Sequence, residues 1–328
     1  MAQKDHIRPE SRPQNWGRTF CRLGFIGTLS LSFVDLSILH ASATEAHFKS
    51  QVIHTHTVSY APQPLPWKRI PAHSILLKEL RTGRILFEHE VEKRLSPASL
   101  TKIMSALIIL EKGRLDDLAT VSRNAAKAPK THLRLKVGEV FRLGDLLKAM
   151  MMVSANDACL AAVEHVGGDE EQFVTLMNAK ALALGLTDTH FSNGCGFDGP
   201  DHYSTAEDLA KLSEVAMRNA VFRELVKEER EIITPVSGYR AYVLHNTNRL
   251  LGRIPGVEGV KTGFTSKAGR CLIAKVSQNG SDLLLVILNS NRRWNTAKSL
   301  IDYGFRLTNE HRPIVVSTSR SGHFPLTE

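Results

Sequence analysis

Two short strand-like runs lie near residue 80, and the apolar positions that follow them change to a helical spacing. The runs Ser74–Leu80 and Arg84–Glu90 have the composition of strands, and the triplet Arg81-Thr82-Gly83 between them is typical of a hairpin turn. From Pro97 onward, apolar residues recur every three or four positions, and Gly113 follows the end of this pattern. The folded part of the chain is therefore predicted to open with a hairpin followed by a helix.

Helical periodicity dominates the middle of the chain and gives way to strand-like runs after about residue 240. Four more helices are predicted, over Leu143–Met152, Ala155–Val166, Glu170–Leu184 and Thr205–Arg218. Four more strands are predicted, over Ala241–Leu244, Val257–Phe264, Cys271–Ser277 and Leu283–Leu288, with a last amphipathic helix at Thr296–Phe305. Strands at both ends with helices between them cannot alternate as β-α-β units, so we predict an α+β fold: an antiparallel sheet packed with helices, plus a mainly helical subdomain.

The N-terminal segment has the features of an export signal. Basic residues precede the apolar run Leu23–Leu39, and Ala41-Ser42-Ala43 then gives the small-x-small pattern that suits signal peptidase. Asp35 inside the run is costly in a bilayer, which favours a cleaved signal over an uncleaved anchor. We expect a signal peptide at 1–43, a linker at 44–68, the main domain at 69–308 and a short tail at 309–328. The protein is expected in the periplasm or at the outer face of the cytoplasmic membrane, touching a membrane at most through its N-terminal segment.

Composition narrows the class of partner. The 328 residues carry a formal net charge of +9, which attracts polyanions at long range. Aromatic residues make up only 6% of the chain, and no basic stripe is interleaved with them, so a nucleic-acid partner is not predicted.

Three cysteines would remain after removal of the signal segment: Cys159, Cys195 and Cys271. No CxxC or Cys/His spacing links them, so no metal site is predicted. An odd number leaves at least one thiol unpaired, and we expect all three to be small buried apolar side chains.

Ser99 and Lys102 have the S-x-x-K spacing, which on a helix places hydroxyl and amine one turn apart on the same face. Serine needs a base to become a nucleophile, and an amine can be that base if burial disfavours its charged form. The apolar residues that follow Lys102 predict such burial, and Pro97 places Ser99 near the positive end of the helix. The spacing alone is expected about once by chance in such a chain, so the alternative is an ordinary first turn of a core helix.

Two further elements are candidates for the same site. Ser154-Ala155-Asn156 places polar residues between two apolar helices, which favours a polar group inside a cleft, although Ser154 could instead cap the following helix. Lys261-Thr262-Gly263 lies in a predicted strand, and fewer than about one such triplet is expected by chance in ten chains. A glycine at a sheet edge admits a peptide as an extra strand, and Lys and Thr can bind its carboxylate. A β-turn is the alternative for this triplet.

These three elements, in this order, resemble those of the penicillin-binding proteins and serine β-lactamases. The surrounding sequence resembles the low-molecular-mass D-alanyl-D-alanine carboxypeptidases over roughly residues 70–306, which implies a β-lactamase/transpeptidase-like fold. The runs that carry this resemblance are Pro97–Met104, Ser154–Ala158, His202–Ala206, Asn246–Asn248 and Gly256–Thr265.

The resemblance implies a role for each candidate residue. Ser99 would be the acylated nucleophile and Lys102 its base. Ser154 and Asn156 would relay protons and hold the substrate amide. The loop Ser192–Asp198 would border the cleft.

The resemblance also implies how the substrate is held. Lys261 and Thr262 would bind the terminal carboxylate, while Gly263 gives the substrate access to the strand. The backbone N–H groups of Ser99 and Phe264 would form the oxyanion hole. Arg293, which precedes Tyr303-Gly304-Phe305, would be a carboxylate-binding arginine, although Arg292 stands beside it and a surface charge at a helix start is the alternative.

The implied activity is that of a serine D-Ala-D-Ala carboxypeptidase that needs no metal or cofactor. Its substrates would be peptidoglycan stem peptides, and β-lactams would inhibit it covalently. A D,D-endopeptidase that cuts cross-links and a non-catalytic protein that binds wall peptides are the alternatives. A β-lactamase is disfavoured because no Glu-x-x-Leu-Asn element precedes residue 200. Many relatives carry a C-terminal β-domain and an amphipathic anchor, both of which this chain is expected to lack.

Overall fold

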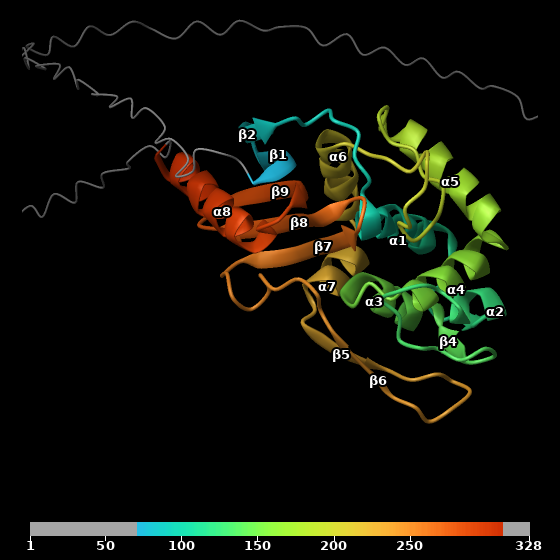
Figure 1. Ribbon diagram of the computed structural model, residues 1–328. Helices are drawn as coiled ribbons and strands as arrows, with labels where there is room; N and C mark the ends of the chain where they lie inside the picture. The colour runs from blue at the N-terminus through green and yellow to red at the C-terminus, as the bar shows by residue number, and fades with distance from the viewer. Residues whose placement is uncertain (1–70, 311–328) are drawn as a thin grey trace, which may run out of the picture. The chain divides into compact units, whose positions relative to one another are not determined.

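Long runs of Leu, Ile and Val form a five-stranded antiparallel sheet in the order β2-β1-β9-β8-β7 (Figure 1). The computed structural model describes residues 71–310. The strands of this sheet are β1 Ala72–Glu79, β2 Ile85–His89, β7 Val257–Thr265, β8 Gly269–Gln278 and β9 Ser281–Ser290. The predicted α+β class and antiparallel sheet are confirmed.

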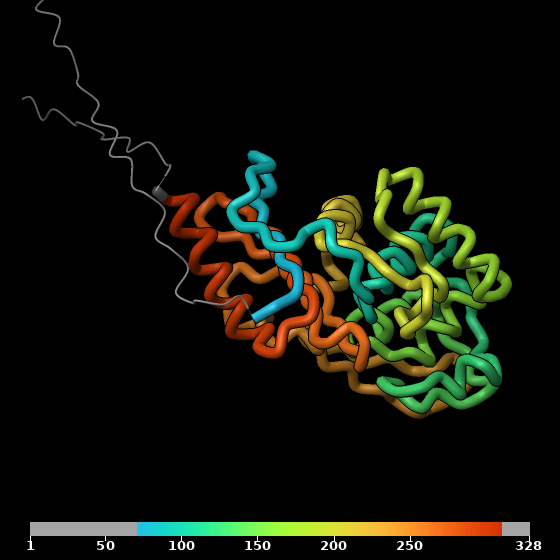
Figure 2. Tube along the Cα trace, turned by 45° about the horizontal axis from the view of Figure 1, so that its top comes forward, coloured from blue at the N-terminus to red at the C-terminus, as the bar shows by residue number. Residues whose placement is uncertain are grey.

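The central strands β1, β8 and β9 are buried on both faces, which explains their continuous apolar runs. Ile75 and Leu77 of β1 pack in a core cluster on one face, and Leu76 packs in a second cluster on the other. Helix α8, Arg293–Glu310, covers the first face and contacts β9, β8 and β1 (Figure 2). The larger cluster joins the opposite face to the helical part of the protein.

The helical part holds most of the remaining elements. The helices are α1 Lys102–Lys112, α2 Arg123–Ala126, α3 Leu143–Met152, α4 Asn156–Gly167, α5 Glu170–Ala183, α6 Ala206–Ala216 and α7 Ala220–Lys227. Two small sheets accompany them, formed by β3 Leu118–Thr120 with β4 Val140–Arg142 and by β5 Arg230–Ile233 with β6 Tyr242–His245. The strand predicted at Ala241–Leu244 is therefore present as β6, but it pairs with β5 and not with the main sheet.

Two helices differ in extent from their prediction. The helix predicted from Pro97 begins with a separate 3₁₀ turn, η1, over Ala98–Thr101 before α1 starts. Helix α8 extends beyond the predicted Thr296–Phe305 at both ends. Gly304 lies inside α8, where the helix packs against the sheet. A Cβ on Gly304 would lie 2.8 Å from the Leu283 Cδ1 atom, so this close packing leaves little room for a larger side chain.

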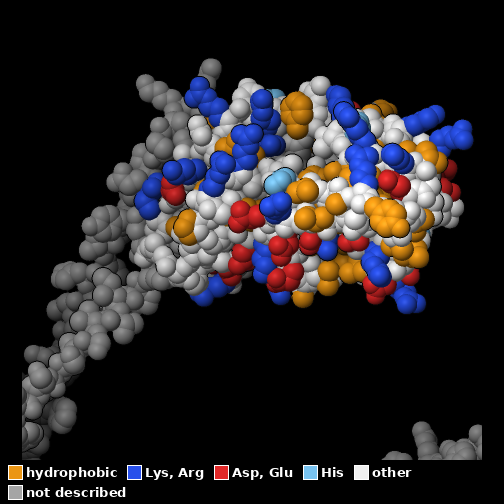
Figure 3. All heavy atoms as spheres, turned by 90° about the horizontal axis from the view of Figure 1, so that it is seen from below, with side chains coloured by type: hydrophobic (Ala, Val, Ile, Leu, Met, Phe, Trp, Pro, Cys, Tyr) orange, Lys and Arg blue, Asp and Glu red, His pale blue; other side chains and the backbone are white. Residues whose placement is uncertain are grey.

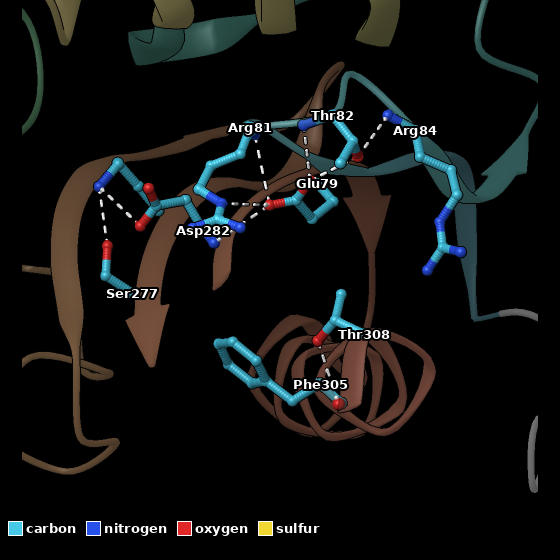
Figure 4. Close-up of polar contacts among 9 residues, drawn as sticks. Glu79, Arg81, Thr82, Arg84, Ser277, Asp282, Phe305 and Thr308 are labelled. Atoms are coloured by element: carbon cyan, nitrogen blue, oxygen red, sulfur yellow. Dashed lines mark hydrogen bonds and ion pairs between the residues drawn. The ribbon is translucent and has the colours of Figure 1, made fainter. Parts of the chain in front are cut away.

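A buried carboxylate holds the predicted hairpin turn between β1 and β2 (Figure 4). Glu79 accepts hydrogen bonds from the Thr82 N–H at 2.7 Å, the Thr82 hydroxyl at 2.5 Å and the Arg81 N–H at 3.3 Å. Burial opposes ionisation of Glu79, but these hydrogen bonds outweigh it, and its pKa lies below the ordinary value. The turn therefore depends on a side chain that precedes it as well as on its own residues.

The predicted signal peptide, the linker and most of the predicted tail lie outside the described residues. Within residues 71–310, no helix is both long enough and apolar enough to cross a bilayer.

Candidate active site

Ser99 and Lys102 lie where η1 passes into α1, between the helical part and β7. The Lys102 Nζ atom is 3.2 Å from the Ser99 Oγ atom. The Lys102 side chain is fully buried, as the apolar sequence after it predicts. The two groups are therefore close enough for direct proton transfer.

The surroundings of Lys102 favour its uncharged form. Its Nζ donates to the Asn156 Oδ1 atom at 2.8 Å and to the carbonyl oxygen of Cys195 at 2.5 Å. In its neutral form, with two N–H bonds and one lone pair, the amine could donate to these two acceptors and accept the proton of the Ser99 hydroxyl. Burial, and then the charge of Lys261, lower the pKa of Lys102 well below its ordinary value.

The orientation of Asn156 is set by a neighbouring loop. Its Nδ2 group donates to the carbonyl oxygens of Pro129 at 2.8 Å and Lys130 at 3.3 Å, which directs Oδ1 toward Lys102. Because both amide donors are taken by carbonyls, the opposite orientation would place N–H groups against the lysine. Asn156, the first residue of α4, thus accepts a hydrogen bond from Lys102 in a fixed orientation.

Ser154 lies in the short connection between α3 and α4, with a positive φ of 62°. The side chain is buried, and among the described residues its hydroxyl makes no hydrogen bond. Ala155 holds the cap position of α4 and no side chain caps that helix, so capping by Ser154 is not observed. The unpaired hydroxyl remains available for a substrate or a proton relay.

The triplet Lys261-Thr262-Gly263 lies in β7 at the edge of the main sheet, so the β-turn alternative is excluded. Lys261 is buried and its Nζ donates to the carbonyl oxygen of Thr262 at 2.9 Å. Thr262 Oγ1 is 2.7 Å from the Thr247 Oγ1 atom. These contacts fix a cation and a hydroxyl beside each other on an edge strand.

Position 263 leaves little room for a side chain because β7 approaches η1 there. A Cβ on Gly263 would lie 3.1 Å from the carbonyl oxygen of Pro97 and 3.3 Å from the Ala98 Cβ atom. The next residue, Phe264, pairs with Arg270 of β8, and its side chain is exposed. The close approach places the backbone of Ser99 and Phe264 on adjoining segments.

Arg293, and not Arg292, contacts β7. Its Nη1 donates to the carbonyl oxygens of Gly263 and Cys271, both at 2.9 Å. Arg292 is exposed and makes no such contact with the strand. Of the two arginines, Arg293 is the one that reaches the strand that carries Lys261, and its role in binding a carboxylate stays a prediction.

The prediction that all three cysteines are unpaired is wrong. Cys159 of α4 and Cys195 form a disulfide with a Cα–Cα distance of 6.0 Å. The fold brings the loop after α5 back against α4, a long-range contact that the sequence spacing does not indicate. Cys271 is free and buried, as expected, and burial raises the pKa of its thiol to about 11.

The disulfide joins the two elements that hold Lys102. Asn156 lies one helical turn before Cys159 on α4, and Cys195 itself supplies the second carbonyl acceptor. Gly196, with φ of 84°, lets this loop pack on η1, because a Cβ there would overlap the carbonyl oxygen of Ala98. Cys195 and Thr247 are the contacts that sequence reasoning missed, although both lie in runs that the family resemblance had singled out.

Loss of this disulfide is expected to slow the reaction with penicillin that the family resemblance implies for Ser99. In a Cys159→Ala/Cys195→Ala variant, the carbonyl acceptor of Lys102 is no longer tied to α4, and small displacements of catalytic groups reduce rates strongly. We expect about a tenfold lower acylation rate with a labelled penicillin, together with a loss of about 2–4 kcal/mol in unfolding free energy.

Cys271→Ala is the matched control, because Cys271 is also buried but forms no disulfide. Stopped-flow labelling and thermal unfolding of both variants measure the effect. Acylation by the double variant at the wild-type rate would contradict a positioning role for the disulfide.

The sequence family follows from comparison with known proteins. The family model for D-alanyl-D-alanine carboxypeptidases, peptidase family S11, matches residues 57–292. The chain belongs to this family.

Within residues 71–310, no group of three His, Cys, Asp or Glu side chains could hold a metal ion.

Individual members of the carboxypeptidase family agree with this assignment. The chain is 35% identical over 258 residues to D-alanyl-D-alanine carboxypeptidase DacF of Bacillus subtilis, an alignment covering 73% of this chain and 64% of DacF. It is 33% identical to DacC of Escherichia coli, covering 79% of this chain and 67% of DacC. The chain thus spans about two thirds of the length of these relatives.

Solved structures confirm the predicted transpeptidase-like fold. The DD-transpeptidase of Streptomyces K15 superimposes with a TM-score of 0.68 at 30% sequence identity. The match covers 73% of this chain and 98% of the transpeptidase.

Proposed function

We propose that this family member is a serine D-Ala-D-Ala carboxypeptidase, which removes the terminal D-alanine of peptidoglycan stem peptides through an acyl-enzyme on Ser99. The observation that carries the proposal is the 3.2 Å contact between Ser99 Oγ and a buried Lys102 whose two donors are already engaged. A protein that only binds wall peptides would have no need of a nucleophile held against an uncharged amine.

Lys102 and Ser99 begin the reaction together. The amine takes the hydroxyl proton as Oγ bonds to the carbonyl carbon of the scissile peptide. The backbone N–H groups of Ser99 and Phe264 stabilise the negative charge on the carbonyl oxygen. The C–N bond then breaks, D-alanine leaves with a proton relayed through Ser154 and Lys102, and water hydrolyses the remaining ester.

A carboxylate next to the scissile bond is the recognised feature of the substrate. Lys261 and Thr262 lie side by side on the edge strand, and Arg293 reaches the same strand from α8. A peptide added along β7 would place its terminal carboxylate against these groups. β-Lactams, which carry a carboxylate beside a reactive amide, would acylate Ser99 in the same way.

An exported location is part of the proposal. Stem peptides lie outside the cytoplasmic membrane, and the Cys159–Cys195 disulfide suits an oxidising compartment. We place the protein in the periplasm or at the outer face of the cytoplasmic membrane.

The activity is tested with a peptide that ends in D-Ala-D-Ala and with the same peptide ending in a carboxamide. We expect D-alanine release from the free acid and at least about tenfold lower kcat/KM for the amide, since the amide cannot pair with Lys261 or Arg293. No D-alanine release by the folded protein would refute the activity, whereas equal rates on both peptides would refute the carboxylate recognition alone.

The pH dependence of kcat/KM is expected to be bell-shaped. Lys102 must lose its proton to act as a base, so activity rises with pH on the acid side. Burial, and then the charge of Arg293, lower the pKa of Lys261 to about 7. Above that pH Lys261 becomes neutral and carboxylate binding weakens, so kcat/KM falls.

The carboxamide peptide is the control for this falling limb, because it has no carboxylate to bind Lys261. Its profile should rise and then level off. A falling limb near pH 7 of equal size with both peptides would contradict the role of Lys261.

A further inference from the structure

A buried histidine lies beside the turn that carries Ser99 and takes no part in the proposed reaction. Charged side chains cover much of the surface drawn in Figure 3, whereas the His202 ring is only 1% exposed. It packs against the phenyl ring of Phe191, with the ring centroids 5.9 Å apart. Burial lowers the pKa of His202 to about 4, so the imidazole is neutral near pH 7. A neutral imidazole has one donor and one acceptor, and a buried ring needs partners for both.

The hydrogen-bond partners of His202 fix its tautomer. Its Nδ1 atom lies 3.0 Å from the backbone nitrogen of Ser192, whose N–H group can only donate. Nδ1 is therefore the acceptor, and the proton lies on Nε2. Nε2 is 2.8 Å from the Thr101 Oγ1 atom, so the ring donates to this hydroxyl. The imidazole thus joins the loop between α5 and α6 to the turn η1.

Thr101 lies between the two residues of the proposed reaction. It follows Ser99 by two positions in η1 and directly precedes Lys102, and its side chain is fully buried. The loop on the other side of His202 supplies the Cys195 carbonyl that accepts from the Lys102 amine. His202 therefore connects the turn that presents the hydroxyl to the loop that holds the amine.

The part of this loop between Ser192 and the Cys195 carbonyl is ordered by one side chain. Asn193 Nδ2 donates to the Phe197 carbonyl at 3.0 Å. Asn193 Oδ1 accepts from three successive backbone N–H groups at 3.2, 2.7 and 2.9 Å, those of Cys195, Gly196 and Phe197. A short stretch of hydrogen-bonded backbone thus links the Ser192 N–H, which His202 accepts, to the carbonyl that Lys102 contacts.

We propose that His202 is a positioning residue for acylation of Ser99, because its Nε2–H bond to Thr101 fixes η1 relative to the loop that carries the Cys195 carbonyl. The inference rests on the proposed function and adds a residue that acts through Thr101 and not on the substrate. Replacing a histidine that only stabilises the core would lower stability alone. Replacing a positioning residue also lowers the rate, since small displacements of reacting groups are costly.

Two replacements separate the two hydrogen bonds of the ring. His202→Gln places an amide N–H near the position of Nε2 and can still donate to Thr101. His202→Asn places an amide oxygen near the position of Nδ1, where it can accept from Ser192, but it is too short to reach Thr101. At saturating labelled penicillin, the acylation rate should fall about tenfold in the Asn variant and stay within about threefold of wild type in the Gln variant. Stopped-flow labelling should give a half-saturating concentration within about twofold of wild type for both.

Thr101→Val removes the other partner of the same bond and keeps the shape of the side chain. It should also lower the acylation rate about tenfold. The double variant Thr101→Val/His202→Asn should be no slower than either single variant, because both substitutions remove one shared interaction. In the wild type, ¹⁵N NMR of the imidazole should show the proton on Nε2.

Ile301→Val is the control for stability. Ile301 is buried in α8, in the core cluster on the face of the main sheet that α8 covers. Loss of one methyl group there should lower the melting temperature by about 2–4 °C. Acylation by this variant should stay at the wild-type rate, which separates a loss of stability from a loss of position.

The outcomes separate this inference from the proposed function. In wild-type protein that labels and releases D-alanine, the positioning role alone is overturned by a His202→Asn variant that acylates at the wild-type rate. Equal slowing of the Gln and Asn variants, or a proton found on Nδ1, overturns it too. Folded wild type that neither releases D-alanine nor reacts with penicillin overturns the proposed function and the positioning role together.

Discussion

Replacement of Ser99 by alanine is expected to abolish D-alanine release and covalent labelling by penicillin. The Ser99 hydroxyl is the group that lies against the Lys102 amine, at 3.2 Å, and its loss removes the atom that forms the acyl-enzyme. Loss of a nucleophile of this kind lowers kcat by about 10⁴-fold or more. Release of D-alanine and gel fluorescence of labelled protein measure the two effects.

Ser213→Ala is the control for this substitution. Ser213 is also a buried serine, but its hydroxyl donates to the Leu209 carbonyl within α6. It should label like wild type. Substantial labelling of the Ser99→Ala protein would show that another group is the nucleophile.

Replacement of Lys102 by methionine is expected to lower the acylation rate by about 10²–10⁴-fold. Methionine has a similar length and no charge, so it fills the buried position but cannot accept the Ser99 proton. The variant also removes the donor to Asn156 and to the Cys195 carbonyl, which should lower the melting temperature.

The pH dependence separates loss of the base from loss of stability. In the wild type, acylation by penicillin should rise with pH as Lys102 loses its proton, starting well below the ordinary pKa of a lysine because Lys102 is buried and close to Lys261. In folded Lys102→Met protein this rise should be absent. The same rising profile in both proteins would assign the base to another residue.

The sequence predicts the local chemistry of the site better than its long-range contacts. A spacing of three residues at a helix start is enough to bring Ser99 and Lys102 together, and an apolar helix is enough to predict that Lys102 is buried. The hydrogen bond from Lys102 to the Cys195 carbonyl cannot be predicted in this way. Every residue has a carbonyl, and only the fold of the loop determines which one lies within reach of Lys102. The Cys159–Cys195 pairing depends on the same loop.

In the fold, too, local elements could be predicted from the sequence and long-range pairings could not. Main-sheet strands buried on both faces, and helices with a strong apolar period, were predictable because burial imposes their pattern. The missed elements include β3, β4, β5 and α2, which are only three or four residues long and too short for any period to appear. The eight-residue helix α7 was also missed, although its apolar residues do recur with a helical period. The separation of β6 from the main sheet could not be read from its residues, since its partner β5 is chosen by the tertiary fold.

The disulfide that stabilises the fold also constrains the two groups that accept hydrogen bonds from Lys102. It joins α4, which carries Asn156, to the loop whose carbonyl accepts a hydrogen bond from Lys102. Lys102, the proposed base, is therefore held by two acceptors that are covalently connected. Such a link limits how far the acceptors can separate when a substrate enters the cleft.

Mass spectrometry of the protein after reaction with a penicillin tests the central claim most directly. The account predicts one added penicilloyl group per chain, on the proteolytic peptide that contains Ser99, and none after the Ser99→Ala substitution. An adduct on a different residue, or no adduct on folded protein that still releases D-alanine, would contradict the assignment of Ser99 as the acylated nucleophile.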